Sequence, residues 1–143
     1  MDNLEKKIFL TSTDTAIGFI SKDSLSLDKA KHRAKGKKYI TALPSLKKLK
    51  KRVPKKYKNL VRRSKKTTFI IDKNFSFRIV KDKKHNLLLK RLGWAYTSSA
   101  NKSNQEYNYN YAYQKTDIII YPLTSSSPST ILKLGKQKIK KVR

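Results

Sequence analysis

The apolar residues of this chain are gathered into short runs rich in Ile, Val, Phe and Tyr, and this pattern constrains the fold more than any other feature. Residues 8–13, 75–80 and 118–121 are such runs. Short runs of this composition are typical of buried strands and not of a disordered chain. Stretches with helical spacing lie between them, so the sequence predicts an α/β (α+β) fold in which a mixed sheet is flanked by short helices.

Two strands in the middle of the chain are expected to form a hairpin. Residues 67–71 and 75–80 are joined by Asp72-Lys73-Asn74, a credible turn. Arg78 alternates with the apolar residues of the second strand, so its side chain must point away from theirs. An inward-facing Arg78 would need an anion, because an unpaired buried guanidinium is very costly. The alternative is an ordinary surface arginine on an edge strand.

Capping residues and prolines indicate where the other elements begin and end. Asp82 is a suitable N-cap for a helix that ends at Gly93. Apolar residues at helical spacing predict two further short helices over residues 46–53 and 57–61, separated by Pro54. The remaining expected elements are a helix end over 28–33 with a stop at Gly36, strands over 38–42 and 94–97, a polar loop with some helix over 98–114, a buried strand over 118–121, a flexible link over 125–127 and a hairpin over 130–142.

The net charge is far outside the range of an ordinary soluble domain. The chain has 36 Lys and Arg against 9 Asp and Glu, a formal charge of +27. Such a balance produces a positive potential over much of the surface and makes polyanions the natural partners. Lys greatly outnumbers Arg, however, so codon bias with mostly solvated charges is an equally good reading, and the charge alone does not decide between them.

Several classes of protein are excluded by what the sequence lacks. There is no cysteine, so disulfides, thiolate metal sites and cysteine nucleophiles are ruled out. No apolar stretch approaches the roughly 20 residues that cross a bilayer. We therefore expect a cytoplasmic protein without a membrane partner, folded as one domain over 1–143, with a basic hairpin or tail over 130–143.

Four short polar segments carry the candidate chemistry, and each is ordinary when taken alone. In chain order they are Thr13-Asp14-Thr15 with Gly18, Lys31-His32-Arg33, Ser98-Ser99-Ala100-Asn101 and Pro128-Ser129-Thr130-Ile131. In this order they resemble the motifs of the YrdC-like threonylcarbamoyl-AMP synthase family (the Sua, YciO, YrdC and YwlC superfamily). Thr68-Phe69 and Phe77-Arg78-Ile79 resemble two strands of the same family, so the similarity runs from Phe9 to Leu134.

The chain also departs from the family pattern. Ser12 stands where the family usually has Pro, Ile17 where an aromatic residue is common, Ala34 where Pro commonly follows the Lys-x-Arg motif, and Ser64-Lys65-Lys66 where a Pro-Gly-Pro-like turn is usual. Compared with the family pattern, the chain lacks the first helix and part of the connection before Lys31. Such trimming is compatible with a weaker enzyme, or with a member that keeps the cleft without the reaction.

The resemblance implies a fold and a reaction. The fold is a single YrdC-like domain with a twisted mixed sheet, short helices and a basic concave cleft. In the reaction, L-threonine and bicarbonate form a carbamate that attacks the α-phosphate of ATP, giving threonylcarbamoyl-AMP and pyrophosphate for the threonylcarbamoyladenosine modification of tRNA. Mg²⁺ is expected to bind together with ATP and to be held by phosphate oxygens and water, because the sequence offers no cluster of carboxylates to hold it. Proteins that transfer the threonylcarbamoyl group to tRNA are possible further partners.

A site of this kind must bring a carboxylate, a carbamate and a triphosphate together, so it needs cations and fixed hydrogen-bond donors. Lys31 and Arg33 are two residues apart and can direct a point charge and a planar fork into one cleft. Ser99 and Asn101 follow an apolar strand, where they can donate to phosphate oxygens. We expect these residues to be catalytic; the alternatives are a solvated basic run and an Asn-containing turn.

Hydroxyl groups and one arginine form the expected substrate and nucleotide contacts. Thr13 and Thr15 suit the amino and carboxylate groups of threonine or the nucleotide, and the resemblance adds Arg78, Ser98 and Ser129. Capping or turn chemistry is the alternative for hydroxyls in a loop. No metal site is expected, and the two histidines, His32 and His85, are predicted to be surface residues.

A second function class competes with the enzyme. The same basic fold could serve a non-catalytic protein that binds double-stranded RNA or tRNA through phosphate contacts. The residues expected on that surface lie in one basic stretch: Lys47, Lys48, Lys51, Arg52, Arg62 and Arg63.

Overall fold

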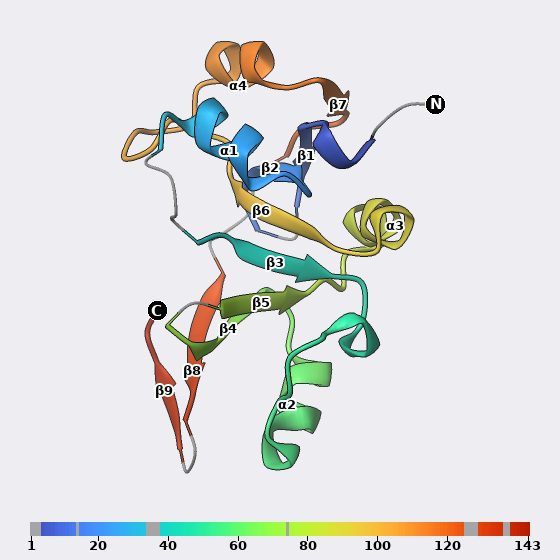
Figure 1. Ribbon diagram of the computed structural model, residues 1–143, viewed down its shortest axis with the longest axis vertical. Coiled ribbons are helices and arrows are strands. Elements are labelled where there is room, and N and C mark those ends of the chain that lie inside the picture. Colours follow the sequence, from blue (N-terminus) through green and yellow to red (C-terminus); the bar gives the residue numbers. More distant parts are fainter. Residues whose placement is uncertain (1–3, 14, 34–37, 74, 125–128, 136–137) are drawn as a thin grey trace.

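The computed structural model describes residues 4–13, 15–33, 38–73, 75–124, 129–135 and 138–143. These residues form a nine-stranded sheet in the order β7-β1-β2-β6-β3-β5-β4-β8-β9 (Figure 1). The strands are β1 Phe9–Ser12, β2 Ile17–Ser21, β3 Ile40–Leu43, β4 Thr67–Asp72, β5 Phe75–Ile79, β6 Ala95–Ser99, β7 Ile118–Ile120, β8 Thr130–Leu134 and β9 Ile139–Lys141.

The sheet is mixed, as the sequence predicts. β1 pairs with β7, β3 with β5 and β4 with β8 in parallel, and the other neighbouring strands are antiparallel. Short helices flank it: α1 Ser24–Lys31, α2 Lys58–Arg63, α3 Lys83–Leu92 and α4 Tyr109–Lys115, with 3-10 turns η1 Leu4–Lys6, η2 Leu46–Lys48 and η3 Lys55–Tyr57. The predicted α/β fold class is confirmed.

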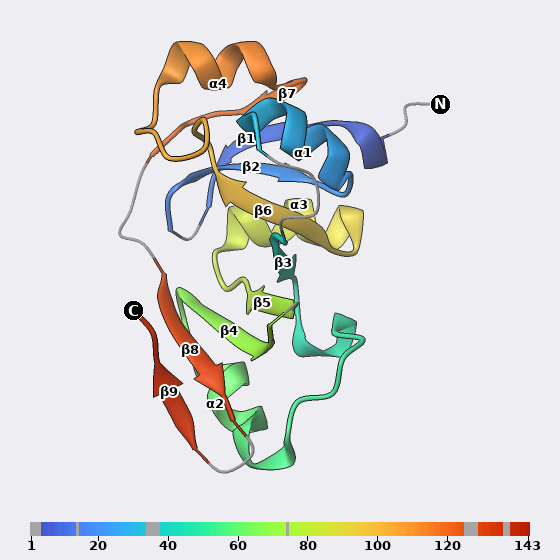
Figure 2. The ribbon, with the colours of Figure 1, turned by 60° about the vertical axis from the view of Figure 1, so that its left-hand side comes forward.

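The helices divide the two faces of the sheet between them. On one face, α1 and α4 cover the β1–β2 end and α2 covers the β4–β8 end, so two apolar clusters lie there (Figure 2). On the opposite face, α3 packs Leu89 and Leu92 against the centre of the sheet. The part of this second face that lies beyond α3 is where the cleft described below opens.

The expected alternation in β5 is confirmed. Phe77 pairs with Phe69 of β4 and with Thr41 of β3, and it belongs to the cluster under α2. Because neighbours along a strand point to opposite faces, Arg78 points to the face with the cleft. β5 lies between β3 and β4, so the reading of Arg78 as an edge-strand surface residue is wrong.

The predicted caps of the third helix are confirmed. The Asp82 carboxylate accepts a hydrogen bond from the His85 backbone N–H at 3.0 Å, and Gly93 ends the helix with φ 88°. The prediction that His85 is a surface residue is wrong, because its exposed fraction is 1%. Positions 85, 89 and 92 recur at helical spacing, and this places the imidazole on the same inward face as Leu89 and Leu92.

The helix predicted over residues 46–53 is also wrong. Only the 3-10 turn Leu46–Lys48 forms, and at Leu49 the backbone is already extended, with φ −73° and ψ 123°. The basic residues here have no acidic partner three or four positions away, so a helix would stack like charges. Pro54 further biases Val53 toward an extended conformation. Residues 44–53 therefore run as a strap along the sheet, which we call the strap below.

The strand over 118–121 was predicted to be buried, and this is wrong. β7 spans Ile118–Ile120 and is only half-buried, because it lies at one end of the sheet and pairs with β1 alone. Several other predicted features fall outside the described residues: the stop at Gly36, the turn residue Asn74, the link over 125–127 and Lys136 of the last turn.

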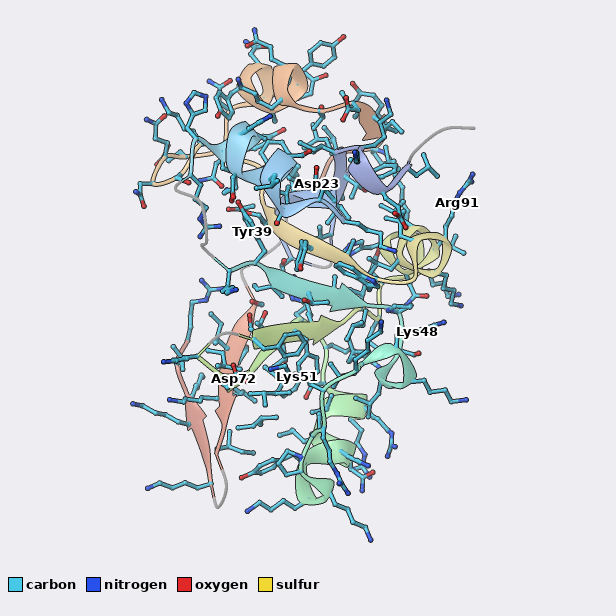
Figure 3. All side chains as sticks on the ribbon, viewed as in Figure 1. Asp23, Tyr39, Lys48, Lys51, Asp72 and Arg91 are labelled. Atoms are coloured by element: carbon cyan, nitrogen blue, oxygen red, sulfur yellow. The ribbon has the colours of Figure 1, made fainter. Side chains whose placement is uncertain are left out.

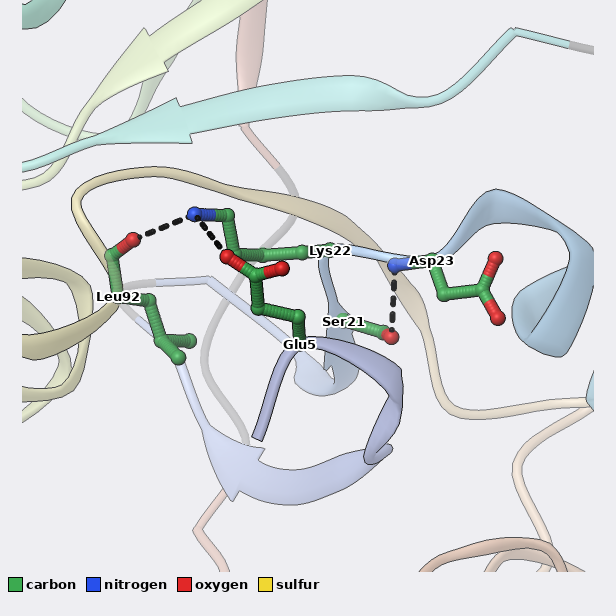
Figure 4. Close-up of polar contacts among 5 residues, drawn as sticks. All are labelled: Glu5, Ser21, Lys22, Asp23 and Leu92. Carbon is green, nitrogen blue, oxygen red and sulfur yellow. Dashed lines mark hydrogen bonds and ion pairs between the residues drawn. The ribbon is translucent and has the colours of Figure 1, made fainter. Parts of the chain in front are cut away.

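The junction between β2 and α1 is fixed by polar contacts (Figure 4). The Lys22 ammonium donates to the carbonyl oxygen of Leu92 at 2.8 Å and lies 3.7 Å from the Glu5 carboxylate, which ties β2 to the end of α3. The Ser21 hydroxyl accepts from the Asp23 N–H at 3.1 Å.

Within the described ranges, the chain has no helix long and apolar enough to cross a membrane.

Gly18 offers a test of how closely β2 and its neighbours pack. A Cβ at this position would lie 3.0 Å from the Ser98 carbonyl oxygen and 3.1 Å from Thr13 Cγ2. We expect Gly18→Ala to lower the free energy of unfolding by about 1–3 kcal/mol, because the backbone of β6 must move to accept the methyl group. Urea denaturation measures this effect, and an unchanged midpoint would mean that the sheet yields there without cost.

Candidate functional site

A cationic cleft opens on the face of the sheet that carries Arg78. Its cavity has a volume of about 450 Å³ and lies where the β1–β2 loop, the start of β3, the end of β6 and the start of β8 meet. Four cations line it, and the described lining includes no carboxylate. The lining cations are Arg33, Lys38, Arg78 and Arg143.

Most of the residues predicted to be catalytic or to contact substrate line this one cleft, although they come from segments far apart in the chain. They are Thr13, Thr15, Gly18, Arg33, Arg78, Ser98, Ser99 and Ser129. Two other predicted residues, Lys31 and Asn101, do not line it and lie directly behind it. Asp14, Ala34 and Pro128 of the motif regions are outside the described residues.

Arg78 is the centre of a buried hydrogen-bond network. Its side chain has an exposed fraction of 5%. The guanidinium donates to Thr15 Oγ1 at 2.9 Å, to Thr68 Oγ1 at 3.1 and 3.2 Å, and to Ser129 Oγ at 3.3 Å. These hydroxyls come from the β1–β2 loop, β4 and the start of β8. The fork of the arginine therefore joins three segments at the base of the cleft.

The threonine pair of the first motif forms a compact turn. Thr13 Oγ1 accepts from the Thr15 N–H at 3.1 Å and donates to the Ala16 carbonyl oxygen at 2.5 Å. The hydroxyl groups of Thr13 and Thr15 lie 3.2 Å apart. The turn chemistry given as the alternative is thus present, and it also directs Thr15 Oγ1 at Arg78.

Lys31 holds the loop that follows β6. Its ammonium donates to the carbonyl oxygens of Ser99 and Asn101 at 2.8 and 2.9 Å and to Asn101 Oδ1 at 3.2 Å. The Ser99 hydroxyl also contacts Asn101 Oδ1. Burial of the side chain, with the Arg33 charge as the smaller cause, lowers the pKa of Lys31 to about 8. Lys31 thus adds positive charge behind the cleft and fixes the loop that carries Ser99 and Asn101.

Asn101 orders its own loop and lines a second, smaller cavity. Its amide donates to the carbonyl oxygens of Lys102 and Gln105 at 2.9 and 2.5 Å. The neighbouring cavity of about 270 Å³ is lined by Asn101, Ser99 and Tyr107 among others. Ser99 lines both cavities, so the loop separates them.

Arg33 lies at the rim of the cleft beside an aromatic residue that the sequence analysis missed. The guanidinium carbon is 4.8 Å from the centroid of the Tyr39 ring. The Tyr39 hydroxyl donates to Asp28 Oδ1 at 2.6 Å. Burial of the side chain raises the pKa of Tyr39 to about 12, and the hydrogen bond to Asp28 is the second cause of this rise. The tyrosine therefore stays neutral, and its fixed ring packs against the Arg33 guanidinium.

Arg143 is a second residue of the cleft that sequence reasoning missed. It donates from Nε to the Ser129 carbonyl oxygen at 3.0 Å and from Nη2 to Ser129 Oγ at 3.2 Å. Ser129 thus accepts from Arg143 on one side and from Arg78 on the other. It is the one arginine in residues 138–143, but no motif marks it, and it is the return of the chain beside β8 that brings it to Ser129.

The residues expected on an RNA-binding surface lie elsewhere. Lys47, Lys51, Arg52 and Arg62 line a separate cavity of about 560 Å³ beside the strap, and none of them lines the cleft. Lys48 lines a smaller pocket on the other side of the strap. Arg63 is exposed on α2 and lines neither of these cavities.

Solved structures with the same architecture were found, although the sequence matches no protein-family model and no curated protein. Sua5 from P. abyssi, solved in complex with L-threonine, shares 18% identity at a TM-score of 0.83, over 97% of this chain and 50% of that chain. YciO from E. coli shares 15% identity at a TM-score of 0.77, over 96% and 82%.

The chain therefore has the fold of Sua5 and YciO, as its motifs predict. It spans half the length of the Sua5 chain. At these identities the likeness concerns the fold.

Proposed function

We propose that the protein is an L-threonylcarbamoyladenylate synthase, which uses L-threonine, bicarbonate and ATP to supply the threonylcarbamoyladenosine modification of tRNA. The observation that carries this proposal is the convergence of motif residues from distant segments on one cationic cleft. The similar fold of Sua5, which was solved with L-threonine, supports it. Such a reaction belongs in the cytoplasm, where ATP, bicarbonate and tRNA meet.

The proposed chemistry has two steps. The amino nitrogen of threonine attacks the carbon of bicarbonate, and loss of water leaves a carbamate. A carbamate oxygen then attacks the α-phosphorus of ATP, the bond to the β-phosphate oxygen breaks, and pyrophosphate leaves with the electron pair. Both steps bring anions together, so the protein contributes mainly positioning and positive charge.

The cleft supplies these contributions through named residues. Arg33 and Arg78 contact phosphate or carbamate oxygens, and their planar forks suit such groups. Thr13 and Thr15 bind the polar groups of threonine, and Ser129 assists the nucleotide. Ser98 and Ser99 offer hydroxyl donors, while Asn101 orders the loop that carries Ser99, and Lys31 adds charge and holds that loop from behind.

Mg²⁺ is proposed to enter with ATP and would be held by phosphate oxygens and water. The part of the chain that the structure describes has no group of three or more His, Cys, Asp or Glu side chains that could hold a metal ion. A Mg²⁺ ion bound mainly through phosphates suits such a cleft, and it would neutralise phosphate charge there.

The direct test is to incubate the protein with ATP, Mg²⁺, L-threonine and bicarbonate and to follow pyrophosphate and the adenylate adduct. We expect pyrophosphate release that requires both threonine and bicarbonate. It should fall about tenfold in Asn101→Ala, as for loss of one charged or polar contact, and should be unchanged in Lys90→Ala/Arg91→Ala, two exposed positions on α3. Threonine-independent release would exclude this activity.

The alternative, a non-catalytic protein that binds double-stranded RNA or tRNA, rests on the charge of +27. Absence of the adduct from a well-folded chain, together with salt-sensitive duplex binding through the basic residues expected on an RNA-binding surface, would favour it. Proteins that accept the adenylate and modify tRNA are proposed partners of the enzyme and have no place in this alternative.

A further inference from the structure

The strap carries a second concentration of positive charge, remote from the cleft. On one side of it lies the cavity of about 560 Å³, which we call the strap groove. Its floor is apolar, with Leu46, Val53 and Ile79, and its walls are cationic. The cations come from the strap, α2 and the segment between β5 and α3: Lys47, Lys51, Arg52, Lys58, Arg62 and Lys81.

These six positive charges face one concave cavity, and acidic side chains among the described residues compensate little of this charge. No carboxylate is among the described residues that line the groove. Within the described ranges, the ion pair that involves one of them joins Lys51 Nζ to Asp72 at 3.1 Å, and both side chains are about half exposed, at 50% and 44% (Figure 3). Like charges gathered within a Debye length raise the local potential and attract a polyanion with closely spaced charges.

Aromatic rings line the other side of the strap. A pocket of about 190 Å³ there is bounded by Phe75, Trp94 and Tyr96, with Lys48 and Lys50 at its edge. This pocket lies over the stretch of β3, β5 and β6 that neither α1 nor α2 covers, so its rings are only partly buried.

The groove and the aromatic pocket adjoin each other at the strap. Leu49 lines both of them. Lys51, which lines the groove, places its ammonium 5.3 Å from the centroid of the Phe75 ring, which lines the pocket. A cation of the groove and an aromatic ring of the pocket therefore lie side by side at the strap.

We propose that the strap binds a single-stranded segment of nucleic acid, with its phosphates in the strap groove and unpaired bases against the aromatic rings. Cationic grooves bordered by aromatic side chains are how proteins hold single strands without reading their sequence. A duplex keeps its bases stacked inside and could use only the cations, as could inorganic polyphosphate. The site shares no lining residue with the cleft, so it stands or falls independently of the synthase.

The charge half of the proposal is tested with Lys47→Ala/Arg62→Ala/Lys81→Ala. These three residues are exposed and come from three different segments, so the fold should persist. Binding of a fluorescent 12-nucleotide U-tract should weaken about tenfold to a hundredfold near 0.1 M salt. The slope of log affinity against log salt should fall by about 2, at about 0.7 per phosphate contact.

The matched control is Lys29→Ala/Lys90→Ala/Arg91→Ala, which also removes two lysines and one arginine from exposed positions and leaves the groove intact. We expect it to bind the strand nearly as the wild type does, and expect both triple variants to bind ATP equally well. An equal loss in the two triple variants would mean that net charge and not the groove attracts the strand, which would overturn the proposal.

The aromatic half is tested with Phe75→Leu/Trp94→Leu, which keeps an apolar surface but removes the flat rings. Strand binding should fall about fivefold or more for each stacked base, without a change in salt slope. Binding of a U·A duplex and of polyphosphate should not change. Loss of duplex and polyphosphate binding by the same factor, or undiminished strand binding, would overturn the proposal and leave a groove for phosphates only.

Discussion

Arg78→Met is expected to weaken ATP binding in the cleft strongly while leaving the fold in place. The guanidinium is the deepest cation of the cleft and holds Thr15, Thr68 and Ser129 in one arrangement. Its loss removes the positive charge from the base of the site and frees three hydroxyls from their common donor. Truncating one partner of a buried charge pair costs about 2–5 kcal/mol, so affinity for ATP should fall about a hundredfold or more.

Stability should respond much less to the same substitution. Methionine is similar in length and removes the cost of burying a guanidinium, which offsets the lost hydrogen bonds. We expect the free energy of unfolding to change by about 1–2 kcal/mol. Isothermal titration with ATP and urea denaturation separate the two effects. A variant that unfolds before it can be assayed would instead assign Arg78 to the structure alone.

Arg78→Lys is the matched variant. It keeps the charge, but a single ammonium cannot hold hydroxyl groups from three segments as the planar fork does. Affinity should therefore lie between that of the wild type and that of Arg78→Met. If lysine restores full affinity, the charge matters and the fork does not, and the proposed network loses its role.

The parts of this site that the sequence predicts are those that depend on local pattern. Alternation along β5 is enough to separate Arg78 from Phe77, because a strand admits only two directions for its side chains. The Thr13–Thr15 turn and the residues after β6 are likewise local features. Their meeting in one cleft followed from the order of the motifs and not from any property of a single segment.

The parts that the sequence misses depend on contacts between distant segments. Arg143 and Tyr39 enter the cleft only because β9 returns beside β8 and because β3 starts next to Arg33. The prediction of a helix in the strap was wrong for a similar reason. Its apolar residues have helical spacing, but Leu49 has an extended backbone and packs against the cluster under α2, to which Val53 belongs. Periodicity alone does not distinguish these two ways of burying the same side chains.

Lys31→Met is expected to weaken the binding of ATP and to remove the pH dependence of that binding. In the wild type the pKa of Lys31 is lowered to about 8, mainly because the side chain is buried and also because Arg33 is near. ATP keeps a constant charge above neutral pH, whereas the ammonium of Lys31 is lost as the pH rises through 8. Affinity for ATP should therefore fall by as much as tenfold per pH unit above this value, as for any ligand that requires the protonated form.

The stability of the fold should move in the opposite direction. The unfolded chain holds this proton up to the ordinary lysine pKa of 10.5, while the folded chain releases it near 8. Between these values the unfolded state binds more protons, so the free energy of unfolding rises with pH. Below pH 8 both states are protonated and the full cost of burying the charge remains.

Titrations of ATP and urea denaturation, both from pH 7 to 9.5, in the wild type, Lys31→Met and Lys29→Met test this pair of trends. Lys29 lies on the same helix but is exposed, so its variant should follow the wild type. Lys31→Met should bind about tenfold to a hundredfold more weakly at pH 7, as for loss of one charge, and should show neither trend above pH 8. A wild-type affinity that stays flat to pH 9.5 would mean that the charge of Lys31 does not act on the cleft, and its role would then be confined to the Ser99–Asn101 loop.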